Sequence, residues 1–167
     1  GSVTRHEGVP GHHLERYNAK RKYLQSHPDI VRGYNSYREG WALYSESLIN
    51  VNRDISKAPR LLDDRINFYS DELGVLLSNL IRSVRLVIDV GINSIQYKMS
   101  YKDVFNFMKS VLPEPDTVIE IEILRAINEP GKLLAYKMGE LIILELRKIW
   151  LSKGRNIKQF HREILFM

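Results

Sequence analysis

The chain has 167 residues, of which 44% are hydrophobic and 27% are charged, and its net charge is +5. These values are typical of one globular domain with a sizeable core. The basic excess is small, and the lysines and arginines lie mainly among acidic residues, which argues against nucleic-acid binding. The sequence has no cysteine, so thiolate chemistry and disulfides are excluded, and any metal must be held by histidine and carboxylate groups.

The ends and the hydropathy of the chain give three expectations about its setting. No apolar run approaches the roughly 20 residues that cross a bilayer, and we expect a cytoplasmic protein without a membrane partner. Gly1 and Ser2 indicate a cloning scar, which leaves residues 3–167 as a single domain. A segment with several potential metal ligands, residues 5–15, lies only a few residues further on. We therefore expect the chain to be a piece of a longer protein, with an N-terminal region that precedes this segment.

Hydrophobic residues recur mostly at intervals of three and four, which predicts an all-α, multi-helix bundle. The first helix is expected over residues 12–26, ending at His27-Pro28, and the second is expected to begin at an Asn35 or Ser36 cap and close near Arg53. A long helix follows from Pro59 to about Gly91. Four more are expected over residues 101–111, 116–127, 131–153 and 157–165.

Residues that start and stop helices separate the later segments. Ser100 is a good N-cap for the helix over 101–111, and Pro113-Glu114-Pro115 ends it. Gly154 suits the C-terminal cap of the helix over 131–153. No stretch has the alternating pattern of a strand, so we expect one all-α domain.

The stretch RHEGVPGHHLE, residues 5–15, contains the chemistry that stands out most. A zinc-peptidase helix usually carries His-Glu-x-x-His, in which two histidines one turn apart bind the metal and the glutamate polarises water. His6 and Glu7 match its beginning, but the position of the second histidine holds Pro10, which cannot be a ligand. Because Pro10 lacks an amide hydrogen and Gly11 loosens the backbone, a regular helix from His6 to His13 is not expected.

The second ligand has two candidates, His12 and His13. If Pro10 and Gly11 form a two-residue excursion, His12 takes the place of the ordinary second histidine and His13 points to one side. We therefore favour His12, with His13 kept as the alternative. A surface patch of histidines without a metal is a further interpretation of this cluster.

A catalytic zinc also needs a third protein ligand and an open position for water. The segment YREGWALYSE offers Glu39 and Glu46, which are seven residues apart and so share a helical face. Either glutamate could reach a neighbouring helix. Each could equally be a solvated surface glutamate.

Five segments together resemble one known family over nearly the whole chain. They are HEGVPGHH, EGWALYSE, RLVIDVGIN, PGKLLAYKMGEL and QFHREIL. In this order they are similar to the C-terminal part of domain-of-unknown-function family 885, which is grouped with the gluzincin metallopeptidases. EGWA is also similar to the NEGFA segment of aminopeptidase N-type enzymes, whose glutamate is the third zinc ligand.

The resemblance implies a gluzincin-like catalytic domain that binds one zinc ion. It implies that His6, His12 and Glu39 are zinc ligands, with Glu7 as the general base. Glu46 would then lie behind the ligands and orient a histidine. The chain departs from the family at Asn93, where a histidine is common, and this could slow the enzyme or alter its specificity.

Other residues could complete the constellation. Tyr136 is the first candidate for a donor to the oxyanion, although a tyrosine packed in a core is an equal alternative, and Tyr44 and Tyr97 are weaker candidates. Arg85 and Asp89 are four residues apart and can pair along a helix. An arginine here could instead bind a substrate carboxylate, but a pair within the chain is favoured.

These observations lead to two hypotheses. The first is a zinc-dependent peptidase domain that hydrolyses peptide bonds with metal-activated water and Glu7 as the general base. The second is an inactive helical scaffold, or a truncated fragment, that keeps the family fold without turnover. For His161, in the segment QFHREIL, a structural hydrogen-bonded role is favoured over a functional one.

Overall fold

The computed structural model describes residues 2–23, 34–48 and 62–166. These residues form eight helices and no strand, so the predicted all-α fold is confirmed for them. The helices are α1 (Ser2–Glu7), α2 (His12–Tyr23), α3 (Asn35–Ser47), α4 (Leu62–Asn93), α5 (Tyr101–Val111), α6 (Asp116–Asn128), α7 (Lys132–Ser152) and α8 (Ile157–Leu165). None of these helices is long and apolar enough to cross a membrane.

Most predicted helices are present, with corrected ends. The short helix α1 was not predicted. The expected ends at His27-Pro28 and near Arg53 lie outside the described residues, although α3 already stops at Ser47. Asn35 and Ser36 are not the cap of α3, because the carbonyl of Tyr34 accepts the first helical bonds, from the amides of Tyr37 and Arg38. Both residues therefore lie inside the first turn.

The caps of α5 and α7 follow the sequence closely. The side chain of Ser100 accepts from the Asp103 amide, and the Asp103 side chain accepts from the Ser100 amide, which forms a capping box. Gly131 caps the N-terminus of α7, and Gly154 follows its C-terminal cap with a φ of 67°. Only glycine adopts such a φ without cost, so this position ends the helix.

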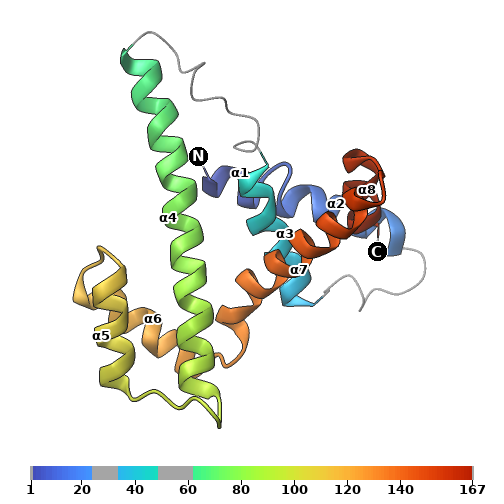
Figure 1. Cartoon of the computed structure of the whole chain (residues 1–167). Helices are drawn as coiled ribbons and strands as arrows, with labels where there is room; N and C mark the ends of the chain where they lie inside the picture. Colours follow the sequence, from blue (N-terminus) through green and yellow to red (C-terminus); the bar gives the residue numbers. More distant parts are fainter. Residues whose placement is uncertain (1, 24–33, 49–61, 167) are drawn as a thin grey trace.

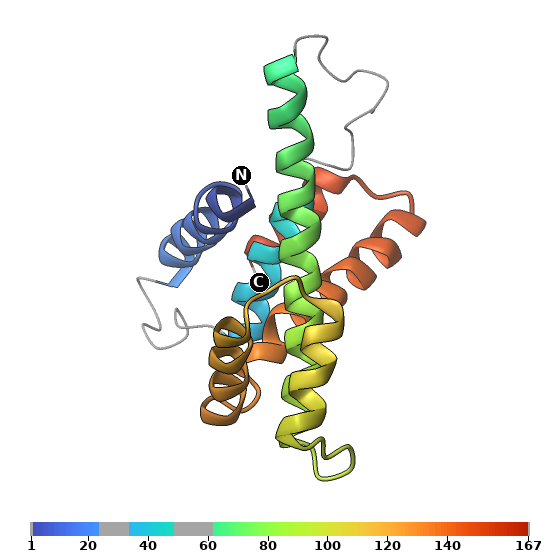
Figure 2. The same ribbon diagram turned by 90° about the vertical axis from the view of Figure 1, so that its left-hand side faces the viewer.

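The long helix α4 is the axis of the molecule, and two groups of helices pack along it (Figure 1). At one end α5 and α6 lie against α4, which Figure 2 shows from a second side. Helix α7 starts at this same end, beside Asp89, and runs along α4 toward α3, with which it has the most extensive contact. Helices α1 and α3 contact α4 further along, and α2 and α8 pack on this second group, which consists of α1, α2, α3, α7 and α8. The candidate site lies in this second group.

Two apolar clusters fill the core. The first joins α4, α5, α6 and the start of α7 through Val84, Ile88, Val104, Met108, Leu112, Ile119, Ile123, Ala126 and Leu133. The second joins α3, α7 and α8 through Trp41, Tyr44, Ile143, Phe160 and Ile164. Burial of such side chains stabilises the fold by about 1.5–3 kcal/mol each.

Helices α3 and α7 cross backbone to backbone at two glycines. A Cβ atom added to Gly40 would lie 2.4 Å from the carbonyl carbon of Gly139, and one added to Gly139 would lie 1.7 Å from the carbonyl oxygen of Ser36. No larger residue fits at either position. The close crossing brings Glu39, next to Gly40, beside Tyr136, one turn before Gly139.

Candidate metal centre

The chain turns sharply between α1 and α2, as the Pro10-Gly11 pair predicted. Helix α1 ends at Glu7, and the amide of Gly8 donates to the carbonyl of Thr4 at 2.9 Å. A Cβ atom added to Gly11 would lie 2.0 Å from the His6 carbonyl oxygen, so only glycine fits there. The indole of Trp41 donates to the Pro10 carbonyl at 2.8 Å and holds the turn against α3.

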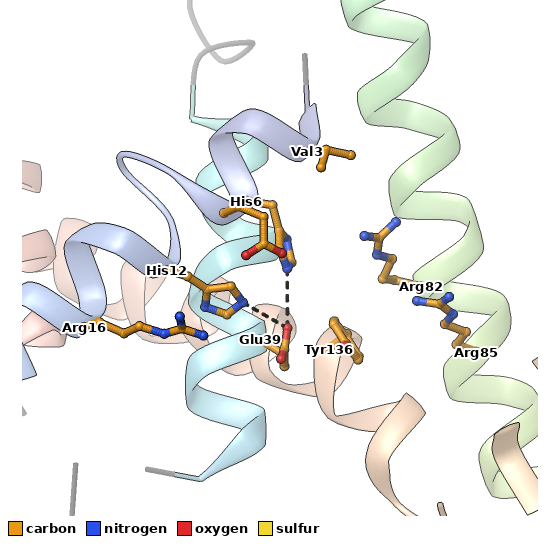
Figure 3. Close-up of a pocket in the computed structure, with 9 residues that line it drawn as sticks. Val3, His6, His12, Arg16, Glu39, Arg82, Arg85 and Tyr136 are labelled. Atoms are coloured by element: carbon orange, nitrogen blue, oxygen red, sulfur yellow. Dashed lines mark ion pairs between the residues drawn. The ribbon is translucent and has the colours of Figure 1, made fainter. Parts of the chain in front are cut away.

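This turn brings His6 and His12 together beside one carboxylate, with their ring centroids 4.8 Å apart. Nε2 of His6 lies 3.4 Å from Oε2 of Glu39, and Nε2 of His12 lies 3.3 Å from the same oxygen. Figure 3 shows the two contacts meeting at Glu39. One nitrogen from each histidine and a Glu39 oxygen lie within 4.8 Å of one another. His6 and His12 are buried, and Glu39 is half-buried.

A buried hydrogen-bond chain fixes the orientation of His6. Its Nδ1 lies 2.8 Å from Oε1 of Glu46, and Oε2 of Glu46 accepts from the hydroxyl of Ser78 at 2.7 Å. Because the carboxylate can only accept, Nδ1 of His6 is the donor, and Nε2 faces Glu39. The arrangement matches the way ligand histidines are held in metalloproteins, where a carboxylate binds the far ring nitrogen.

The ionisation of His6 and Glu39 is coupled. Burial lowers the pKa of His6, but hydrogen bonds to Glu39 and Glu46 outweigh burial and raise it to about 9. Burial raises the pKa of Glu39, whereas hydrogen bonds from His12 and His6 outweigh it and lower the pKa to about 2. The cluster therefore holds a proton that a metal ion would displace.

His12 is supported less completely than His6. Its Nδ1 is buried without a hydrogen-bond partner among the described residues, and Oε2 of Glu15 lies 4.0 Å away. Burial raises the pKa of Glu15. A small movement of either side chain would give His12 the same kind of carboxylate support that Glu46 gives His6.

The donor set fits a zinc ion. Two imidazole nitrogens and one carboxylate oxygen are the ligands of many catalytic zinc sites. Ligand atoms around a tetrahedral zinc lie about 3.3–3.6 Å from one another, given the usual bond lengths. The two distances to Glu39, 3.4 and 3.3 Å, fall in that range.

A cavity of about 250 Å³ opens beside the cluster. Six residues that the sequence indicated as site residues line it: His6, Glu7, His12, Glu39, Arg85 and Tyr136. The sequence did not single out Val3 and Arg16, which also line it, and it gave Arg82 no role of its own. Exposed or partly exposed cations such as Arg16 and Arg82 carry no spacing signal, so only the fold could reveal them.

Three predicted site residues lie outside the cavity. His13 is exposed on α2 and does not belong to the cluster of His6, His12 and Glu39, so the geometry favours His12 as the second ligand. Glu46 lies behind His6, where the family resemblance implied it. Asp89 is buried near the start of α7 and takes no part in the pocket.

Arg85 forms the expected ion pair within the chain, but its partner is Glu122 and not Asp89. Arg85 donates from Nε and Nη2 to both oxygens of Glu122 on α6, at 2.6 and 2.7 Å. Asp89 instead accepts from the amides of Gly131 and Leu134, each at 2.9 Å. The physical reason is that unpaired amides at a helix N-terminus attract a carboxylate, and α7 begins beside Asp89.

The tyrosine candidates for an oxyanion donor separate clearly. Tyr136 lines the cavity, and its ring stacks on His6 with a centroid distance of 6.4 Å. Tyr44 is fully buried, and its hydroxyl lies 2.8 Å from Nε2 of His161. Tyr44 and His161 therefore have a structural, hydrogen-bonded role, which is the role favoured for His161 from the sequence. Tyr97 is exposed in the segment after α4, and it lines a different groove.

Asn93, the departure from the family pattern, is also structural. Its amide donates to Asp89 at 2.9 Å and to the Ala126 carbonyl at 3.0 Å. Asn93 does not line the cavity, so its difference from histidine does not alter the cavity wall directly.

Comparison with known proteins shows that the chain is similar to a solved structure and matches a family model. The crystal structure of the putative lipoprotein from Colwellia psychrerythraea is 30% identical to this chain, with a TM-score of 0.77. The match covers 99% of this chain and 27% of that protein, so the chain spans about a quarter of its length. No curated protein matches the chain. The family model described as "Bacterial protein of unknown function (DUF885)" matches residues 1–167, and the chain therefore belongs to the DUF885 family.

Proposed function

We propose that this chain carries the catalytic zinc site of a gluzincin-like peptidase. His6, His12 and Glu39 hold one zinc ion, and the substrate is a peptide bound in the adjoining cavity. The observation that carries the proposal is that one oxygen of Glu39 lies 3.4 and 3.3 Å from the Nε2 atoms of both histidines, at the wall of that cavity.

The residues around the cluster have separate roles in hydrolysis. A zinc ion, when bound, supplies a Lewis acid that polarises the scissile carbonyl and lowers the pKa of water. Glu7, exposed at the cavity, takes a proton from the attacking water and delivers it to the leaving amine. Tyr136 donates a hydrogen bond to the oxyanion, and Glu46 keeps the ring of His6 in place.

The assignment of the metal ligands is tested by metal content. We expect the chain, purified without a metal-affinity tag and supplied with zinc, to retain about one equivalent by plasma mass spectrometry. His12→Ala should lose the metal, and the matched variant His13→Ala should keep it, because only His12 faces Glu39. Failure of the unaltered chain to bind zinc would favour the inactive-scaffold hypothesis.

The role of Glu7 is tested by separating binding from turnover. Glu7→Gln keeps the size of the side chain but cannot accept a proton, so zinc should stay bound while peptide hydrolysis is lost by at least about a hundredfold. Release of amines from a mixture of short peptides measures this loss. Hydrolysis at an unchanged rate would remove Glu7 from the mechanism.

A further inference from the structure

Helix α4 presents two arginines to the cavity, and they differ in what they bind. Figure 3 shows Arg82 and Arg85 on α4, across the cavity from His6 and Glu39. Both oxygens of Glu122 pair with Arg85, at 2.6 and 2.7 Å, so its charge is already compensated. Two planar hydrogen bonds of this kind are geometrically specific and strong. Arg85 therefore has little capacity left for another anion.

Arg82 has no such partner. Its Nη1 makes only a long contact, 3.4 Å, to the Ser78 carbonyl of its own helix, and its Nε is buried without an acceptor. No described carboxylate forms an ion pair with Arg82, and its Nη2 has no acceptor among the described residues. A partly buried guanidinium without an anion is costly, because its desolvation is not compensated.

The electrostatics agree with this picture. Burial lowers the pKa of Arg82, and the negative charge of Glu46 partly offsets this lowering. Both oxygens of Glu46 already bind His6 and Ser78, so Glu46 is not free to pair with Arg82. Arg82 lines the same cavity as His6 and Glu39, so an anion bound to it would lie near the candidate metal ligands.

We propose that Arg82 binds a carboxylate of the substrate, so that the pocket selects peptides with a free carboxylate near the bond to be cleaved. This inference rests on the proposed peptidase function of the same pocket. A cavity of about 250 Å³ encloses only a small part of a peptide. Two sources supply such a group: the C-terminal carboxylate of a short peptide, or an acidic side chain.

Binding to a chain that cannot turn over separates this inference from catalysis. Isothermal calorimetry on the Glu7→Gln chain supplied with zinc would compare acetyl-Ala-Ala-Ala as the free acid, the same peptide as its amide, and acetyl-Ala-Glu-Ala amide. We expect at least one carboxylate peptide to bind about tenfold to hundredfold more tightly than the neutral amide. The carboxylate peptide that binds tightly identifies the source.

Variants locate the carboxylate receptor. Arg82→Met should abolish the preference, and Arg82→Lys should keep only part of it, because an ammonium cannot make two planar hydrogen bonds. The double variant Arg85→Met with Glu122→Gln removes a compensated pair and should keep the preference. Arg162→Ala, exposed on α8, controls for the loss of one positive charge.

Three results would overturn the proposal. The first is equal affinity for acid and amide peptides, and the second is no measurable binding of any of them. The third is a preference that persists in Arg82→Met and disappears in the Arg85–Glu122 double variant. Zinc content of each variant and hydrolysis by the chain with Glu7 intact are measured in parallel, so the peptidase proposal stands or falls on its own result.

Discussion

The two ends of α4 are stabilised in different ways. Where α5 and α6 pack, the core consists of aliphatic and methionine side chains, and many are fully buried. Where α1 and α3 pack, buried positions hold His6, Glu46 and Ser78, joined by hydrogen bonds. Apolar packing tolerates substitutions of similar volume, whereas the loss of one member of a buried polar network leaves its partners unsatisfied and costs stability. Both groups of helices have an apolar cluster, but only the second also depends on a buried polar network, which keeps the site ordered and makes it sensitive to substitution.

The largest expected effect comes from the turn between α1 and α2. In Gly11→Ala the new methyl group would lie 2.0 Å from the His6 carbonyl oxygen, so the turn and His12 must move. Displacing a site group by about 1 Å reduces catalysis by about a hundredfold, and we expect a loss of this size or larger in peptide hydrolysis, together with weaker zinc binding. Kinetics and zinc titration measure both effects.

Gly74→Ala is the matched control, because Gly74 is a glycine with open space around it. A Cβ atom at Gly74, inside α4, meets nothing within 4 Å, so this variant should gain about 0.5–1 kcal/mol in stability and keep the zinc affinity. If Gly11→Ala behaved like Gly74→Ala, the turn would not be fixed as described.

Asp89→Ala should destabilise the fold without altering the site. It leaves the amides of Gly131 and Leu134 without their acceptor, which we expect to reduce the free energy of unfolding by about 2–3 kcal/mol. Urea denaturation measures the loss, and zinc affinity of the folded chain should stay unchanged. A large fall in zinc affinity at unchanged stability would mean that Asp89 acts on the site after all.

Glu46→Gln should weaken the site without unfolding the chain. The neutral amide no longer stabilises the donor nitrogen of His6 as a carboxylate does, so zinc affinity should fall about tenfold to hundredfold. The matched variant is Glu140→Gln, a buried glutamate that pairs with Lys137 and does not contact His6. Equal zinc affinities of the two variants would contradict the role given to Glu46.

The smallest effect is a pH dependence that changes sign with the metal. In the metal-free chain the pKa of His6 is raised from 6.5 to about 9, so its contribution to stability is complete below pH 6.5 and is lost as the pH rises to 9. A metal ion needs the deprotonated ring, so zinc binding should strengthen over the same interval. Thermal unfolding with and without zinc, from pH 6.5 to 9, should give opposite slopes. Slopes of the same sign would contradict the idea that a proton and the zinc ion compete for the ring of His6.

The sequence predicted the apolar end more completely than the site. Periodicity located α5, α6 and α7 almost to the residue, because their helices have clear caps such as Ser100 and breaks such as Pro113. The motif over residues 5–15 also indicated His6, Glu7 and His12, and the resemblance of EGWA to the family pattern indicated Glu39. These are local signals that need no knowledge of which helices meet.

The sequence failed where partners lie far apart in the chain. Arg85 and Asp89 stand one turn apart on α4, and their mutual pairing was the natural local prediction. Glu122 and the amide of Gly131 are better partners, but only the packing of α6 and α7 against α4 brings them close. The special position of Arg82 depends on the same packing, because it follows from the absence of a described acidic partner.

The backbone contact at Gly40 and Gly139 has a consequence for how the pocket could be redesigned. Since the helices touch without intervening side chains, the spacing between the walls that carry Glu39 and Tyr136 cannot be adjusted by exchanging one residue for a larger or smaller one. The opposite wall, on α4, is made of long side chains that can be shortened, lengthened or recharged. New substrate preferences would therefore be engineered on α4, while the distance between α3 and α7 stays fixed by their backbone contact.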